Sequence, residues 1–208
     1  MNYQTLHETT FLVMYLTATL ATFVIVERMI FYSFTLRHAR SIESLLTNGN
    51  TTQITGQLQS AVSVPVEALQ RMVAARARIQ NRHDQEDISE AIYLSLKAKL
   101  QHRLWILDTA VTAAPLLGLL GTIFGIIETF GALAKSGVSD PASVSASIGT
   151  ALFATALGIA IALYGLIFFN LFQDRVERIG EHLRIIILHA GIGSTGEAVN
   201  ENATRTLP

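Results

Sequence analysis

The run TAVTAAPLLGLLGTIFGII, residues 109–127, contains no charged side chain and decides how the rest of the chain is interpreted. It is about as long as the ~20 apolar residues that carry a helix across the ~30 Å hydrocarbon core of a bilayer. A second uncharged run lies at residues 9–26, and its apolar character resumes after two charged residues up to Phe34. A third uncharged run occupies residues 141–173. The sequence therefore predicts an all-α protein with three membrane-spanning helices in a phospholipid bilayer.

The composition supports a membrane protein and excludes several other classes. Of 208 residues 15% are charged, whereas about a quarter are charged in an ordinary soluble domain. The 15 basic and 16 acidic residues nearly balance, which argues against a nucleic-acid partner. There is no cysteine, the six histidines are scattered, and no P-loop, nucleophile-elbow or zinc-protease motif occurs. No enzyme activity, catalytic residue, metal or cofactor is predicted.

The placement of basic residues predicts the orientation of the chain in the membrane. No Lys or Arg lies in residues 1–10, and Lys135 is the one basic residue between 131 and 140. By the positive-inside rule the N-terminus is outside and the C-terminus is cytoplasmic. The predicted order is an external N-terminus (1–9), a transmembrane helix (10–34), a cytoplasmic helical region (35–104), a second transmembrane helix (105–130), a short external loop (131–142), a third transmembrane helix (143–172) and a cytoplasmic tail (173–208).

The cytoplasmic region is expected to be helical. One helix is predicted to begin near Pro65, which suits a first helical turn, and another after Asp84 as its N-cap. Ile and Leu recur every three or four residues from Ile88 to Leu107, so this helix is expected to run directly into the second membrane helix. The basic residues of this region are followed closely by acidic ones, which indicates a solvated helix face rather than a lipid or nucleic-acid patch: Arg71, Arg76, Arg78 and Arg82, then Glu86, Asp87 and Glu90.

The second uncharged run contains residues that let helices pack closely. Gly118, Gly121 and Gly125 have small-residue spacing of the GxxxG kind, which brings backbones together where lipid provides no hydrophobic drive for association. Pro115 removes one backbone hydrogen bond and is expected to kink the helix, which a bundle tolerates because neighbours or water satisfy the freed carbonyl. We assign these four residues to helix packing.

The third run carries a stripe of small residues on one helix face. Its members recur at spacings of four, three, four and three: Ala151, Thr155, Gly158, Ala162 and Gly165. Thr155 and, in the second run, Thr122 are expected near the middle of the membrane. A single Thr in a spanning helix usually bonds to a carbonyl of its own helix, but the two together, among small neighbours, indicate a hydroxyl-lined lumen. One three-helix subunit is not expected to bury all of these small-residue stripes, which predicts assembly as a ring.

The segment APLLGLLGTIFGIIETF from Ala114, followed by SIGTALFATALGIAIA from Ser147, resembles the paired signature of the MotA/TolQ/ExbB proton channel family, closest to its ExbB and TolQ branch. With the matching topology, the resemblance covers residues 13–172. It implies one subunit of a pentameric ring in the bacterial inner membrane, with a periplasmic N-terminus. The second and third helices would line a space that holds a dimer of ExbD- or TolR-like single-span proteins. An aspartate of that partner would take protons down the proton-motive force, and the motion would pass to TonB or TolA.

The resemblance also implies which residues matter. The pore threonines of the family correspond to Thr122 and Thr155, and its packing glycines to Gly118, Gly121, Gly125 and Gly158. The chain departs from the family at Thr150, where many ExbB and TolQ members carry a glutamate. Glu128 and, at the inner entrance, Asp108 are candidates for the missing acid. In the alternative interpretation Glu128 only reaches the outer interface towards Lys135.

These observations lead to an expected function with two alternatives. The first expectation is an ExbB-like motor subunit that energises TonB-dependent transport across the outer membrane. A TolQ-like motor subunit for envelope maintenance has the same features. A membrane scaffold that holds its partner without passing protons is the third possibility, which the loss of the glutamate at Thr150 permits.

Overall fold

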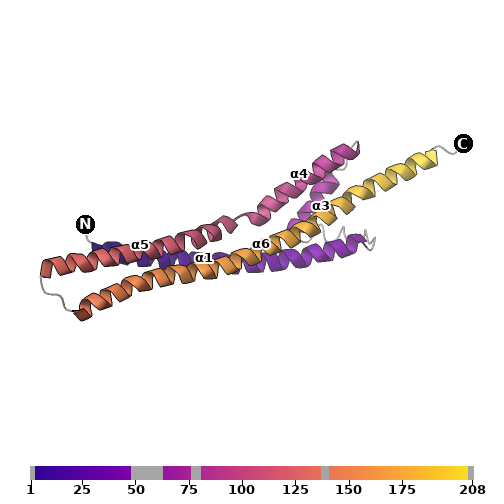
Figure 1. Cartoon of the computed structure of the whole chain (residues 1–208). Helices are drawn as coiled ribbons and strands as arrows, with labels where there is room; N and C mark the ends of the chain where they lie inside the picture. The colour runs from indigo at the N-terminus through magenta and orange to yellow at the C-terminus, as the bar shows by residue number, and fades with distance from the viewer. Residues whose placement is uncertain (1–2, 48–62, 76–80, 137–140, 206–208) are drawn as a thin grey trace. The chain divides into compact units, whose positions relative to one another are not determined.

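The computed structural model describes residues 3–47, 63–75, 81–136 and 141–205, and the side chains of residues 5–44, 63–75, 81–134 and 141–191 (Figure 1). The described residues form helices and no strand, which confirms the predicted all-α fold. The helices are α1 (Tyr3–Thr47), α3 (Val64–Ala75), α4 (Arg82–Gln101), α5 (Leu104–Ser136) and α6 (Pro141–Arg205). Residues 137–140 of the predicted external loop lie outside the described residues, as do Arg76 and Arg78.

Three helices are long and apolar enough to cross a membrane. The candidate spans are Thr5–Ser44 in α1, Leu104–Ala134 in α5 and Pro141–Gly191 in α6. Each contains one of the uncharged runs of the sequence, so the prediction of three such helices is confirmed. The membrane boundaries within these helices and the orientation of the termini stay predictions.

The chain divides into two compact units, and the first contains residues 1–28 and 103–171. It comprises the first part of α1, all of α5 and the first part of α6, which Figure 1 shows running along one another. Its core is a cluster of small and medium apolar side chains from all three segments: Met14, Ala114, Ile161 and Ala162, with Ala18, Leu117 and Leu157 packed against them. The candidate functional residues of the sequence lie in this unit.

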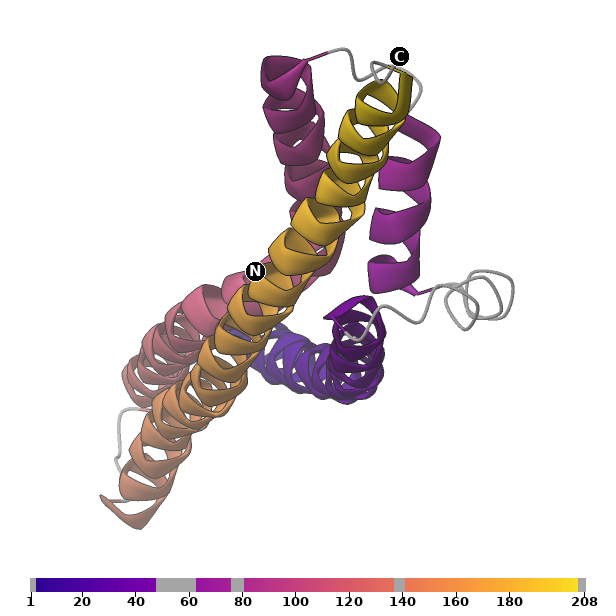
Figure 2. The same cartoon turned by 90° about the vertical axis from the view of Figure 1, so that its right-hand side faces the viewer.

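The second unit contains residues 29–102 and 172–208, and Figure 2 shows α3 and α4 alongside the C-terminal half of α6. Tyr32 of α1 is fully buried and packs against Phe172 of α6, with ring centroids 5.5 Å apart and the rings tilted by 52°. Its hydroxyl donates a 2.7 Å hydrogen bond to the Leu100 carbonyl. That carbonyl lies in the last turn of α4, where carbonyls lack partners within the helix. Tyr32 therefore fixes the end of α4 to α1.

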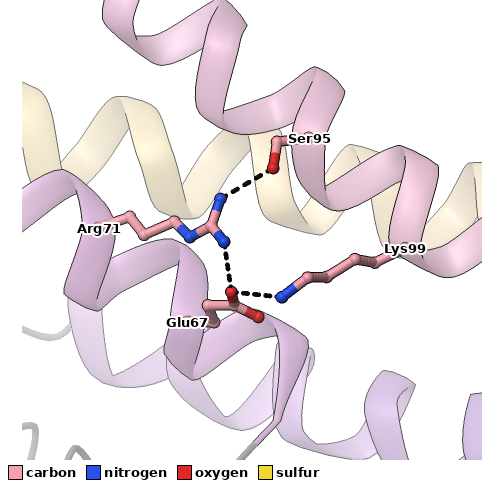
Figure 3. Close-up of polar contacts among 4 residues, drawn as sticks. All are labelled: Glu67, Arg71, Ser95 and Lys99. Carbon is pink, nitrogen blue, oxygen red and sulfur yellow. Dashed lines mark hydrogen bonds and ion pairs between the residues drawn. The ribbon is translucent and has the colours of Figure 1, made fainter.

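A charge cluster joins α3 to α4 in this second unit (Figure 3). Glu67 of α3 accepts from Lys99 of α4 at 2.6 Å and from Arg71, one turn along α3, at 2.7 Å. Arg71 also donates to the Ser95 hydroxyl of α4 at 2.8 Å. Burial by itself raises the pKa of the Glu67 carboxyl, but the hydrogen bond from Lys99 and the charges of Arg71 and Lys99 outweigh it and hold the pKa below its ordinary value of 4.5.

The start of α4 differs from the sequence prediction. Asp84 was expected to be the N-cap, but Asn81 has this position, with extended backbone angles of φ −145° and ψ 173°. Its side-chain oxygen accepts the Asp84 N–H at 2.9 Å. Asn and Asp are comparable caps, and the helix begins one turn earlier because Asp84 also suits the first turn, where its charge complements the helix dipole.

The junction between α4 and α5 also contradicts the sequence prediction of one continuous helix. His102 ends α4 with extended backbone angles of φ −55° and ψ 134°, and Arg103 has a φ of 74°. A positive φ is costly for a residue with a side chain, by about 1–2 kcal/mol. The Arg103 guanidinium donates to Glu27 of α1 at 2.6 Å, a contact that favours this conformation.

Candidate functional site

Glycines bring α5 and α6 into close contact in the first unit. A Cβ added to Gly158 would lie 2.5 Å from the Ala114 carbonyl oxygen and 3.0 Å from the Gly118 Cα. A Cβ added to Gly118 would lie 2.9 Å from the Ala154 carbonyl oxygen. Side-chain carbons essentially never approach other atoms this closely, so the packing requires glycine at both positions. Ala114 precedes Pro115, so the closest approach lies at the proline inside α5.

The small-residue stripe of α6 faces α5 within the same chain. Ala151, Gly158, Ala162 and Gly165 are all buried, and Thr155 is half-buried. The expectation that one subunit cannot bury the stripes is therefore wrong, because the paired glycines remove the side chains that would hold α5 and α6 apart. Burial of these stripes within one chain therefore removes the sequence-based reason for predicting a ring.

Thr122 of α5 and Thr155 of α6 lie together at this contact. Their hydroxyl oxygens are in direct hydrogen-bonding contact with each other. Both also point at one carbonyl, since each oxygen lies 3.1 Å from the Gly118 carbonyl oxygen. Thr122 is in addition 3.3 Å from the Ala151 carbonyl oxygen of α6. The structure thus brings together two residues that are 33 positions apart in the sequence.

The hydroxyl pair has more acceptors than hydrogens. The two hydroxyls make four oxygen–oxygen contacts but carry two hydrogens, so at most two of these contacts are conventional hydrogen bonds at one time. Several arrangements of the hydrogens therefore satisfy the same oxygens. Each hydroxyl oxygen can also accept a hydrogen bond from a further donor. Both side chains are half-buried, so such a donor has room to approach them. Such a pair can exchange hydrogen bonds without carrying a charge.

The acidic candidates are separate from this pair. Thr150, at the position of the family glutamate, is exposed, and its hydroxyl bonds back to the Ala146 carbonyl at 3.1 Å. Glu128 is half-buried and makes no hydrogen bond or ion pair with the residues that the structure describes. Asp108 is exposed near the start of α5. The Lys135 side chain lies outside the described residues, so anchoring of Glu128 towards it stays a prediction.

Gly121 and Gly125 of α5 pack closely against α6 and also lie near α1, a contact that the sequence did not predict. A Cβ added to Gly121 would lie 2.9 Å from the Ala154 Cβ and 3.5 Å from the Thr10 Cγ2. A Cβ added to Gly125 would lie 2.7 Å from the Ala151 Cβ and 3.4 Å from His7 Nε2. The first turns of α1 therefore complete the packing around the α5–α6 contact.

The comparison with known families agrees with these features. The model of the MotA/TolQ/ExbB proton channel family matches residues 63–185, more than half of the chain, and this segment includes both threonines and the packing glycines. The chain belongs to the MotA/TolQ/ExbB proton channel family. As a member of this family with three apolar helices of sufficient length, it is a multi-pass membrane protein.

Curated relatives of this chain include proteins that carry the ExbB name. The biopolymer transport protein ExbB of Aquifex aeolicus is 36% identical over 82 residues, 39% of this chain and 55% of the relative. That of Helicobacter pylori is 36% identical over 92 residues, 44% of this chain and 63% of the relative. An ExbB homolog of Methanothermobacter thermautotrophicus is 32% identical over 122 residues, 59% of this chain and 41% of the relative. The chain thus spans between 41% and 63% of the length of these relatives.

Proposed function

We propose that the chain is the ring-forming subunit of an ExbB-like motor driven by the proton-motive force in the bacterial inner membrane. In this proposal a homo-oligomer, a pentamer by family resemblance, surrounds ExbD-like partner helices and energises TonB-dependent transport across the outer membrane. The contact of Thr122 with Thr155 inside the segment matched by the proton channel family is the observation that carries the proposal. The ExbB names of the relatives support the transport role.

The threonine pair suits a titrating group that belongs to another chain. A partner carboxylate next to the pair accepts hydrogen bonds from the hydroxyls, and the protonated carboxyl donates to them instead. The pair reorients between these states because its hydrogens have alternative acceptors. A second buried charge in the membrane would be costly, and hydroxyls avoid that cost. The partner aspartate therefore carries the proton, and the threonines guide it.

The test replaces each threonine by valine, which keeps the shape and removes the hydroxyl. We expect the Thr122→Val and Thr155→Val proteins to assemble and bind the partner but to lose proton-driven uptake, with a reduction of about 100-fold for the double variant. Thr112→Val is the matched control, since Thr112 is an exposed residue of α5 whose hydroxyl lies 3.1 Å from the Asp108 carbonyl of its own helix. Loss of assembly would assign the pair to packing.

The scaffold alternative rests on Thr150, whose exposed hydroxyl cannot titrate in place of the family glutamate. A scaffold would bind its partner with equal affinity in the double valine variant and would show no proton flux in the unmodified complex. Proton flux by the unmodified complex reconstituted in liposomes would exclude it. The TolQ-like alternative differs in its phenotype, because deletion would weaken the cell envelope while leaving TonB-dependent uptake intact.

A further inference from the structure

His7 belongs to the segment predicted to be the external N-terminus, and it lies where α1, α5 and α6 meet. Its Nε2 atom is 3.4 Å from the position of a Cβ added to Gly125, and the same Cβ would lie 2.7 Å from the Ala151 Cβ. Any side chain at residue 125 would therefore clash with Ala151 of α6, and its Cβ would be in contact with the imidazole. The imidazole lies against a backbone position that only glycine leaves open.

The buried ring nitrogen of His7 has no hydrogen-bond partner in the part of the chain that the structure describes. Nε2 is inaccessible to solvent. The ring packs edge-on against Phe11 at 5.0 Å, with an interplanar angle of 82°. A ring nitrogen of histidine is always either a donor or an acceptor, so burial without a partner costs free energy. A residue needed only for packing would avoid that cost, and the edge-on contact with Phe11 is equally available to phenylalanine.

Ala151 connects the level of His7 to the threonine pair. Its carbonyl oxygen lies 3.3 Å from the Thr122 hydroxyl, and its Cβ adjoins the Gly125 position that His7 contacts. Gly125 follows Thr122 by three residues, which is about 4.5 Å along the axis of a helix.

The charged neighbours of His7 are few. On α1 the adjacent Glu8 is exposed, and on α5 Glu128 lies three residues beyond Gly125 without an ion pair to His7 among the described residues. In α6, residues 141–173 contain no charged side chain. Histidine is the side chain whose unperturbed charge change falls between about pH 5 and pH 8. His7 is thus an ionisable side chain near the level of Ala151, where α6 has Thr150 in place of an acid.

We propose that His7 exchanges protons between the external side and the threonine pair, in the role that a glutamate on α6 has in other family members. The neutral imidazole takes a proton from hydronium at Nδ1 and releases water. The imidazolium then gives its Nε2 proton through bridging water to the Thr122 oxygen, while the Thr122 hydroxyl passes its own hydrogen to the partner carboxylate. The hydroxyl is regenerated, and the imidazole returns to a neutral form with its hydrogen on Nδ1. This inference rests on the proposed function, because it needs the partner carboxylate as the final acceptor.

The experiment measures proton flux into liposomes that contain the full chain with its co-purified partner, at external pH values from about 5 to about 8. We expect His7→Gln to lower the flux about 100-fold and to abolish its pH inflection. His7→Phe keeps the packing of a ring against Phe11 and should lower the flux to the same extent as His7→Gln. His102→Gln is the matched control, since His102 is exposed at the end of α4 and should leave the flux unchanged.

The outcomes separate this inference from the proposed function. Normal flux in His7→Gln beside lost flux in the double valine variant of Thr122 and Thr155 would overturn the role of His7 alone. Normal flux in both would overturn the proposed function as well. Lost assembly in both His7 variants would make His7 a packing residue and would also overturn the inference. Lost flux in Glu128→Gln with normal flux in His7→Gln would assign the exchange to Glu128.

Discussion

Glu67 is a carboxylate held by cations from two helices, and its titration should control how firmly α3 is attached to α4. Its pKa is held below 4.5 in the folded chain, so its contribution to stability is complete above the unfolded value and is lost as the pH falls through the folded value. We expect amide hydrogen exchange in α3 to accelerate as the pH of the detergent-solubilised protein is lowered below about 4.5, after correction for intrinsic exchange rates. Glu67→Gln should show fast exchange in α3 already at pH 7.

Glu86 is the matched control for this prediction. It pairs with Arg82 at 3.2 Å within α4, but both side chains are mostly exposed, with 65% and 92% accessible. Exposed pairs of this kind contribute little to stability. Glu86→Gln should therefore leave exchange in α3 unchanged, and an equal response to both substitutions would contradict a specific role of Glu67.

Sequence reasoning at the scale of residues singled out Thr122 and Thr155, which the structure brings into contact, but did not anticipate the position of His7 against Gly125. Thr122 and Thr155 lie within uncharged runs, where their hydroxyl groups differ from the mostly apolar side chains around them. His7 lies before the uncharged run, so charge counting placed it outside the membrane. A helical signal was available, since His7 lies three and seven residues before the buried Thr10 and Met14 and so shares their helix face. The contact with Gly125 depends on the packing of α1 against α5, which no local pattern contains.

The contact between α5 and α6 depends on glycine in a way that a single methyl group can test. Gly158→Ala would bring its Cβ to 2.5 Å from the Ala114 carbonyl oxygen, so the two helices must separate. Overpacking of this kind costs about 1–3 kcal/mol. We expect Gly158→Ala to lower the thermal unfolding temperature of the detergent-solubilised protein and to weaken the contact of Thr122 with Thr155, detected as reduced crosslinking between cysteines placed at those two positions.

Gly131 provides the control because a Cβ there would meet no atom within 4 Å. Gly131→Ala should leave the unfolding temperature unchanged or raise it slightly, since alanine favours helix by about 1 kcal/mol over glycine. Equal destabilisation by both substitutions would show that the loss of stability is not specific to the contact between α5 and α6.

At the scale of elements, hydropathy predicted the three long helices, and it failed at the junction of α4 with α5. The apolar period runs through Leu100, Leu104 and Leu107, all of which are buried, so the pattern looks continuous across the break. The break depends on a positive φ at Arg103, which an arginine rarely adopts, and on the ion pair of its guanidinium with Glu27. Hydrophobic periodicity describes only local spacing, so it cannot predict a contact between residues 76 positions apart.

At the scale of the whole molecule, α5 and α6 both keep faces that are not covered within the chain. That of α5 presents large apolar side chains, with Leu116 66% exposed and Phe130 62% exposed. On α6, small exposed residues share one face with large ones that are 59% and 56% exposed: Ser145, Gly149, Ala156 and Ala160, with Leu152 and Leu163. Since lipid offers no hydrophobic drive for association, the small residues are the positions where a neighbouring helix can approach closely.

These two faces argue for the ring more directly than the stripe that lies buried within the chain. A contact between the α5 face of one copy and the α6 face of the next joins two different surfaces, so it repeats from copy to copy until it closes on itself. We expect native mass spectrometry of the protein in mild detergent to show a closed homo-oligomer, a pentamer by family resemblance. Ala156 is exposed in the single chain, so Ala156→Leu should leave the subunit fold intact. The larger side chain should prevent a neighbouring helix from approaching α6 closely at this position and should release monomers. The monomers should keep the Thr122–Thr155 crosslink, since that contact lies within one chain. Monomers from the unmodified protein in lipid nanodiscs would disprove the ring, whereas intact oligomers of Ala156→Leu would move the interface to another face.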